Sequence, residues 1–219
     1  MRQTSVIIFF TVVIIFSVLV KKSISQVTDI DGNEYKTVKI GNQEWMAENL
    51  NVEHYRNGDV IPQVQDAKEW SILTTGAWCY YENNSENGKT YGKLYNWYAV
   101  NDSRGLAPEG WHIPTDAEWT QLVDFLGGRE VAGSNLKATT LWNKPNKGAT
   151  NNSGFTAFPG GVRNSTGDFV VIGENGAFWS STEGKTDHAW YRDLSFDYTG
   201  SNRTTNNKKD GFSVRCVMD

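Results

Sequence analysis

The strongest constraint on the fold is one helix whose beginning and end are both marked, starting within GWHIPTDAEW at residues 110–119. Thr115 and Glu118 have the S/T-x-x-E spacing of a capping box, in which each side chain accepts the other residue's backbone amide. Four apolar residues then follow the spacing of one helical face: Trp119, Leu122, Val123 and Leu126. Gly127-Gly128 ends the helix. His112 lies before the cap, and we interpret it as a structural residue rather than a catalytic one.

Strand patterns lie on both sides of this helix. Residues 34–49 contain two extended segments around Gly41-Asn42, a two-residue loop typical of a tight hairpin. Later segments with strand character lie at 177–182, 189–196 and 211–218. In the last of these, two sets alternate: Phe212, Val214, Cys216 and Met218 against Ser213, Arg215 and Val217. This alternation predicts an antiparallel strand that is buried on one side only.

The remaining segments are less regular. We expect one or two helical turns at 66–71, a weaker second helix at 130–138, and a buried strand or short helix at 94–100. Residues 142–168 are rich in Asn, Gly, Ser and Thr and predict a long loop, which three aromatic residues should tie to the core: Trp142, Phe155 and Phe158. The run TGSNRTTNNKKD at 199–210 is interpreted as a solvated loop.

The N-terminus carries an export pattern. Fifteen residues from position 6 to position 20 are almost entirely apolar, and Arg2 precedes them. This length suits a signal-peptide core and is short for a bilayer span. Small residues at 23 and 25 predict a signal peptide over residues 1–25, cleaved before Gln26. The lysines at 21 and 22 favour the alternative of an uncleaved signal anchor, which would be the only membrane attachment we expect.

Residues 26–219 have the length of one domain. Without the three basic residues of the leader, 18 basic side chains stand against 25 acidic ones, a formal net charge near −7. That balance argues against nucleic acid as a partner. All nine tryptophans lie in this part, which predicts an irregular fold anchored by large aromatic side chains. We expect a monomer.

Cys79 and Cys216 are the only cysteines. In an exported chain the default expectation is one disulfide between them, and two separate buried thiols are the alternative. Neither cysteine has a second cysteine or a histidine at metal-ligand spacing, so we expect no metal site built on them.

Five motifs, in this order, resemble one family: GNQEWMAENL, LYNWYAVNDSRGLAPEGWHIPTDAEW, GFTAFPGGVRN, AFWSSTE and GFSVRCV. The chain resembles the Fibrobacter succinogenes major paralogous domain, a family of exported bacterial proteins, over nearly all of residues 26–219. It is also similar, more remotely, to formylglycine-generating-enzyme-like domains. This second resemblance implies an α+β, C-type-lectin-like fold. Such a fold has a small twisted antiparallel sheet whose N- and C-terminal strands pair, two helices and a long irregular loop region. The family implies a secreted or cell-envelope location in a bacterium and says little about activity.

Two functions find little support in the residues. The oxidising members of the wider superfamily need a reactive cysteine pair, whereas Cys79 and Cys216 lie in patterns typical of buried, inert thiols. We therefore expect no catalytic residue and no cofactor, and keep a carbohydrate-acting or oxidoreductase-type enzyme as the alternative.

Calcium-dependent lectins place oxygen ligands around a cis-proline, but here Lys144 precedes Pro145, and a lysine cannot ligate calcium. We expect no metal of that kind; a different calcium site using Glu174, Asn175 or Asp187 stays open.

The function we favour is a non-catalytic binding module for a protein or carbohydrate ligand. In C-type-lectin-like binders, the long loop and the late strands form the ligand surface. The candidate ligand-binding residues in these segments are Trp142, Arg163, Tyr191, Asp193, Tyr198, Asn202 and Arg203. Strand alternation puts Tyr191 and Asp193 opposite Trp190 and Arg192, and we expect the first pair to be the more exposed. For Trp142, a core position is the favoured alternative.

Overall fold

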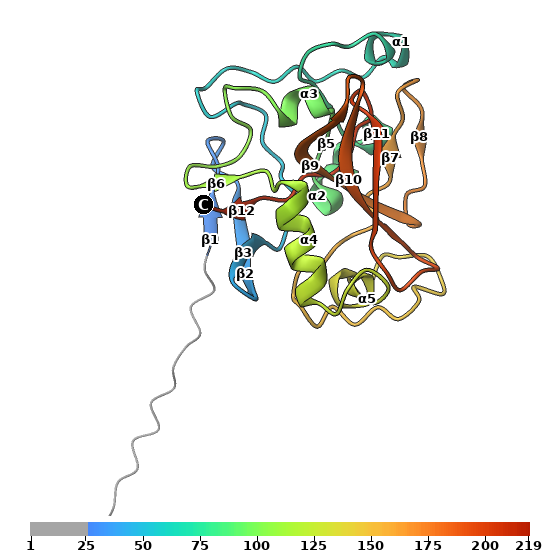
Figure 1. The fold of residues 1–219 in the computed structure, drawn as a ribbon. Helices are drawn as coiled ribbons and strands as arrows, with labels where there is room; N and C mark the ends of the chain where they lie inside the picture. The colour runs from blue at the N-terminus through green and yellow to red at the C-terminus, as the bar shows by residue number, and fades with distance from the viewer. Residues whose placement is uncertain (1–25) are drawn as a thin grey trace, which may run out of the picture.

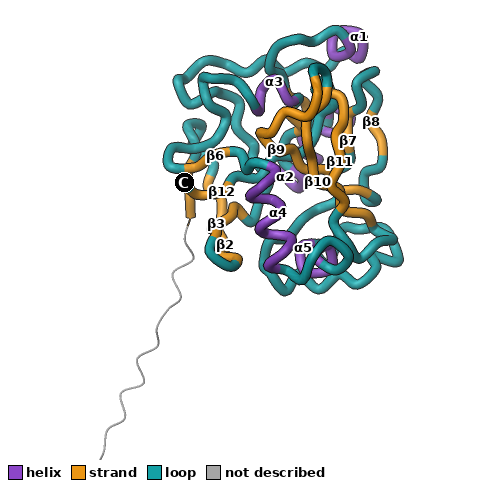
Figure 2. Tube along the Cα trace, viewed as in Figure 1, coloured by secondary structure: helices purple, strands orange, loops and turns teal. Residues whose placement is uncertain are grey.

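The computed structural model describes residues 26–219, so the predicted signal peptide lies outside the described residues. The strands are β1 (Gln26–Thr28), β2 (Glu34–Ile40), β3 (Gln43–Met46), β4 (Trp78–Cys79), β5 (Leu94–Tyr95), β6 (Trp111–His112), β7 (Val162–Arg163), β8 (Phe169–Val170), β9 (Asn175–Lys185), β10 (His188–Ser195), β11 (Asn202–Asn207) and β12 (Val217–Met218). The helices are α1 (Ala67–Ser71), the 3₁₀ turn η1 (Tyr81–Asn83), α2 (Ser85–Tyr91), α3 (Trp97–Val100), α4 (Asp116–Phe125) and α5 (Ala132–Leu136). Figure 2 shows how much loop separates these short elements. Within residues 26–219, none of the helices is long and apolar enough to cross a bilayer.

The two ends of the domain meet in one antiparallel sheet of order β1-β2-β3-β12-β6. The predicted hairpin is confirmed: β2 and β3 pair up to Ile40 and Gln43, with Gly41 in the left-handed region at φ 62°. The C-terminal strand β12 lies between β3 and β6, where Val217 pairs with both Trp45 and His112. Figure 1 shows the C-terminus beside β1 and β6. The expected pairing of the terminal strand with the early hairpin is therefore present.

Helix α4 follows the predicted capping box. The Thr115 oxygen accepts the Glu118 amide at 3.2 Å, and the Glu118 carboxylate accepts the Thr115 amide at 2.7 Å. Such a cap contributes about 1 kcal/mol to stability. His112 lies between the Glu118 and Asp219 carboxylates, at 2.8 and 2.6 Å, so it joins the cap to the C-terminal residue. These contacts are consistent with the structural role expected from the sequence.

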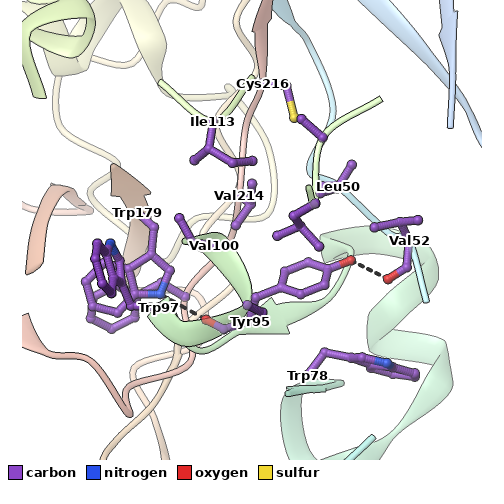
Figure 3. Close-up of a cluster of buried hydrophobic side chains, with 14 of the residues drawn as sticks. Leu50, Val52, Trp78, Tyr95, Trp97, Val100, Ile113, Trp179, Val214 and Cys216 are labelled. Carbon is purple, nitrogen blue, oxygen red and sulfur yellow. Dashed lines mark hydrogen bonds between the residues drawn. The ribbon is translucent and has the colours of Figure 1, made fainter. Parts of the chain in front are cut away.

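Aromatic side chains hold the core through their polar atoms as well as their rings. In the cluster of Figure 3, the Trp179 indole donates to the Tyr95 carbonyl at 2.9 Å, and the Tyr95 hydroxyl donates to the Val52 carbonyl at 2.7 Å. Trp119 of α4 donates in turn to the Trp179 carbonyl. Buried indoles and phenols thereby satisfy their own polar atoms with backbone carbonyls inside the core.

The C-terminal segment corrects one prediction, because it is buried on both sides and only Val217–Met218 forms a strand. Arg215, predicted on the solvent side, has no exposed surface, whereas Met218 is 50 % exposed. The Arg215 guanidinium donates to the Asn49 side chain and to three backbone carbonyls, those of Met46, Phe155 and Thr156. Burial lowers the pKa of Arg215 to about 9. This arginine therefore fastens the long loop to the early hairpin.

The expected disulfide is absent, since Cys79 and Cys216 are both free thiols. They lie in different hydrophobic clusters: Cys79 with Trp70 and Leu94, Cys216 with Trp111 and Val214. The alternative of two separate buried thiols is the one that the structure has. Aromatic packing holds each segment in place without a covalent link.

Candidate binding face on the late strands

The late strands form a sheet of order β11-β10-β9, which stands apart from the terminal sheet in Figure 1. Residues 199–210, interpreted from sequence as a loop, instead contain the edge strand β11. Directly paired residues share a face of the sheet. Arg192 pairs with Arg203, and Asp193 pairs with Asn202, so the two pairs lie on opposite faces.

One face of this sheet, which we name the paired face, carries Trp190, Arg192 and Arg203 and meets Asp116 at the start of α4. The Asp116 carboxylate accepts from Arg192 Nη1 at 2.6 Å and from Arg203 Nη2 at 2.7 Å. The guanidinium of Arg203 also stacks 3.7 Å from the Trp190 ring centroid. Burial alone would raise the pKa of Asp116, but the bonds from Arg203 and Arg192 outweigh it and lower that pKa. The paired face is thus an ion-pair clamp between the sheet and α4.

The other face, which we name the acidic face, comprises Asn175, Tyr191, Asp193 and Asn202 together with Asp210 from the segment after β11. Asp193 accepts only from amides, at 2.7 Å from Asn175 and 3.3 Å from Asn202. Burial raises its pKa despite these bonds. Burial also raises the pKa of Asp210, to about 7, and this side chain is only 3 % exposed. Within residues 26–219, neither carboxylate forms an ion pair with lysine or arginine.

The charges of both carboxylates of the acidic face act on Tyr191. Its ring is half-buried against Phe212 and Trp179, with centroids 4.7 and 6.0 Å apart. Burial, then the charges of Asp193 and Asp210, raises the Tyr191 pKa to about 12. Tyr191 was expected on the more exposed side of the strand, and it is half-buried there by this packing. Desolvated carboxylates with raised pKa values make this face a candidate functional site.

The structure brings together three of the seven predicted site residues, namely Tyr191, Asp193 and Asn202. Arg203 lies on the paired face. Tyr198 lies away from the acidic face, where its hydroxyl donates to Glu130. Trp142 is buried and its indole donates to the Ala157 carbonyl, so the core alternative describes it better.

Arg163 also leaves the candidate site. It has no exposed surface, and its guanidinium donates to the carbonyls of Val64, Gln65 and Gly167. The same guanidinium stacks over the Trp70 ring at 4.4 Å. It therefore holds the early loop against β7 and has no surface left for a ligand.

Sequence reasoning missed Asp210 and named Asn175 only for a possible calcium site, not for this face. Asn175 pairs with Ser195 across β9 and β10, which places it on the same face as Asp193. Strand alternation could have found Asn175 once the β9–β10 register was known. Asp210 follows a polar run and joins the site only because Gly211 pairs with Arg163, a contact that no local pattern shows. The part of the chain that the structure describes contains no group of three or more His, Cys, Asp or Glu side chains placed to hold a metal ion.

These features define a mixed α/β domain of curled antiparallel sheets with a candidate binding face on its late strands. The chain belongs to the Fibrobacter succinogenes major domain family, whose model matches residues 38–218. Neither a curated protein nor a solved structure matches the chain.

Proposed function

We propose that this protein is an exported, non-catalytic binding module with a C-type-lectin-like scaffold, which recognises a protein or glycan at the envelope of a bacterial cell. Support for the scaffold comes from the order of the elements. An early hairpin, a capped helix, a long tied-down loop and late strands are followed by a terminal strand that returns to the hairpin. The export signal and the envelope location rest on the sequence pattern and the family.

The observation that carries the proposal is the acidic face. Within residues 26–219, Asp193 and Asp210 are desolvated and have no lysine or arginine partner, whereas Asp116 of α4 is paired with two arginines from the other side of the sheet. Leaving buried charge uncompensated costs stability, and a ligand that supplies hydrogen-bond donors would remove that cost. Tyr191 adds an aromatic surface with one polar end, which suits either a protein contact or a sugar.

The two thiols support a non-catalytic role. Burial raises the pKa of Cys79 to about 12 and raises the pKa of Cys216 further above its ordinary value. The thiolate is the reactive form of cysteine, so neither residue is poised for oxidation or nucleophilic attack at neutral pH. They also lie in separate hydrophobic clusters.

One observation favours the alternative of a carbohydrate-acting enzyme. A carboxyl group whose pKa lies near 7 can act as a general acid, and Asp210 is such a group, with a second carboxylate across Tyr191. Incubation of the purified protein with a panel of oligosaccharides separates the two functions. Binding without product formation supports the module; turnover that Asp210→Asn abolishes supports the enzyme.

The binding test compares the purified protein with two variants on a glycan array and on immobilised envelope proteins of the producing cell. Asp193→Asn removes one charge from the acidic face. Asp124→Asn removes one from the exposed side of α4 and serves as the matched control. We expect Asp193→Asn to lower the affinity for the recognised ligand by about tenfold and Asp124→Asn to leave that affinity unchanged. Equal affinities of all three proteins would contradict the proposal.

A further inference from the structure

A cavity of about 290 Å³ opens between α3, the loop before β4 and the turn after α3. Its lining residues come from two segments of the early half of the chain: Thr74, Thr75 and Gly76, then Trp97, Tyr98, Asn101, Asp102, Ser103 and Arg104. None of them belongs to the acidic face. The volume is at the small end of ligand-binding cavities.

The charged groups of this cavity already neutralise one another. Arg104 binds the Asp102 carboxylate with two parallel bonds, at 2.9 Å through Nε and 2.8 Å through Nη2. Its Nη1 reaches Asp59 at 3.2 Å, and the guanidinium stacks 4.0 Å from the Tyr55 ring centroid. The bonds from Arg104 outweigh the effect of burial and lower the pKa of Asp102. A bidentate pair of this kind is geometrically rigid, so it offers a fixed wall rather than a free charge.

The rest of the polar wall is neutral and uncommitted. Thr74, Thr75 and Ser103 contribute hydroxyls and Asn101 contributes an amide, and all four residues are exposed. Over residues 26–219, no hydrogen bond to another protein group occupies these four side chains. Tyr98 adds a half-exposed aromatic ring. Hydroxyl and amide groups both donate and accept, which matches the alternating donors and acceptors of a polyol.

Gly76 fixes the back of the cavity. A Cβ atom at this position would lie 1.9 Å from the Tyr55 hydroxyl oxygen and 2.9 Å from the Ala99 Cα. Only glycine therefore lets the loop before β4 lie this close to α3. The close approach sets the distance between the Thr75 side of the cavity and the Arg104 side.

We propose that this cavity binds one ring of a neutral sugar through vicinal hydroxyls. A free anion would find the only arginine already paired, and a cation would find both Asp102 oxygens already bonded to Arg104. An apolar ligand would meet only two aromatic residues among the nine that line the cavity. A hydroxyl-rich, uncharged ligand uses every remaining group. This cavity shares no residue with the acidic face, so failure of one proposal does not refute the other.

The test uses the whole purified protein and four free sugars as probes: D-glucose, D-galactose, D-mannose and N-acetyl-D-glucosamine. Each is titrated into the millimolar range and followed by saturation-transfer-difference NMR. Ser103→Trp fills the cavity from an exposed position, and Ser85→Trp adds the same bulk at the exposed start of α2 as a matched control. We expect saturable binding of at least one sugar by the wild-type protein and by Ser85→Trp, with a loss of about tenfold or more in Ser103→Trp.

Two further variants make the outcome decisive. Asn101→Ala removes an exposed amide without adding bulk, so it should weaken binding even if the tryptophan variant fails to fold. Asp124→Asn, on the exposed side of α4 and outside the cavity lining, should leave sugar binding unchanged. No sugar binding by the wild-type protein, or binding that Ser103→Trp and Asn101→Ala both retain, overturns the inference. Loss of binding in Asp124→Asn alone would also overturn it, because the sugar would then bind outside this cavity.

Discussion

The two faces of the β9–β10–β11 sheet treat charge in opposite ways. On the paired face, Asp116 takes bonds from Arg192 and Arg203, and its pKa falls. On the acidic face, Asp193 and Asp210 have no such partner among residues 26–219, and burial raises the pKa of each. Both faces belong to the same strands, but only Asp193 is itself on the sheet: Asp116 begins α4 and Asp210 follows β11. The comparison suggests a rule for this fold. A buried carboxylate that joins two elements is paired with arginine, and a buried carboxylate without such a partner is a candidate for ligand recognition.

Asp116→Ala should show the largest effect, because it leaves the buried Arg192 guanidinium without an anion. Breaking a buried ion pair costs about 3–5 kcal/mol in the free energy of unfolding. Chemical denaturation monitored by tryptophan fluorescence measures this loss. Asp124→Ala, on an exposed part of the same helix, should change the free energy by about 0.5 kcal/mol or less. Similar losses in both variants would mean that the paired face is not a clamp.

Asp210→Asn should instead stabilise the protein at neutral and higher pH. The folded pKa of Asp210, about 7, lies above the unfolded value near 4, so the folded state holds more protons between these pH values. The wild-type protein therefore loses stability as pH rises from about 4 to 7, and the variant loses less. A difference of roughly 2–4 kcal/mol should appear at pH 8 and vanish at pH 4. Asp193 keeps some slope in both proteins, because its pKa is also raised.

Stability curves in urea at several pH values measure this difference. The groups that act on Asp210 are the Ser165 amide and His188, both of which lower its pKa, and Asp197 acts on Asp193. A wild-type curve that is flat from pH 4 to pH 8 would show that Asp210 is neutralised, and the contrast between the two faces would then disappear.

Single changes on the two faces should separate stability from affinity. Tyr191→Phe removes only a hydroxyl from the acidic face. It should lower the affinity for the ligand by about tenfold, with little change in the free energy of unfolding. Arg203→Met, on the paired face, should cost about 1 kcal/mol of stability and leave affinity unchanged, because it breaks a half-exposed ion pair and its stack on Trp190. Affinity is measured by calorimetry and stability by urea denaturation. The reverse assignment of the two effects would contradict the account.

The thiols should react only when the protein unfolds. Without reductant, iodoacetamide should leave Cys79 and Cys216 unmodified in the native protein and should add two groups in denaturant. Intact-mass spectrometry counts the additions. No addition in denaturant would indicate a disulfide, and one fast addition in the native protein would favour the oxidoreductase alternative.

Local patterns predicted much of the fold. The Thr115–Glu118 cap, the Gly41-Asn42 hairpin and the return of the terminal strand all follow from nearby residues or from the family order. The failures share a cause, since they depend on contacts between distant segments. Arg163 and Arg215 read as surface residues because the backbone carbonyls that accept their hydrogen bonds lie far away in the sequence.

The candidate site was predicted only in part for the same reason. Strand alternation placed Tyr191 and Asp193 on one face, and pairing with β10 added Asn202 to it. Asp210 entered through the contact of Gly211 with β7, and its pKa depends on burial that no spacing reveals. The disulfide expectation failed because export favours cystine in general, whereas this core fills both segments with aromatic side chains.

Photo-crosslinking from β11 tests the central claim most directly. Thr204 pairs with Tyr191 and lies on the acidic face, whereas Thr205 pairs with Trp190 and lies on the paired face, one residue away on the same strand. A photoreactive amino acid at each position, in otherwise identical protein, is irradiated with the ligand found in the binding screen. The account predicts a crosslink from position 204 and none above background from position 205. Equal crosslinking, or a crosslink from 205 alone, would contradict it.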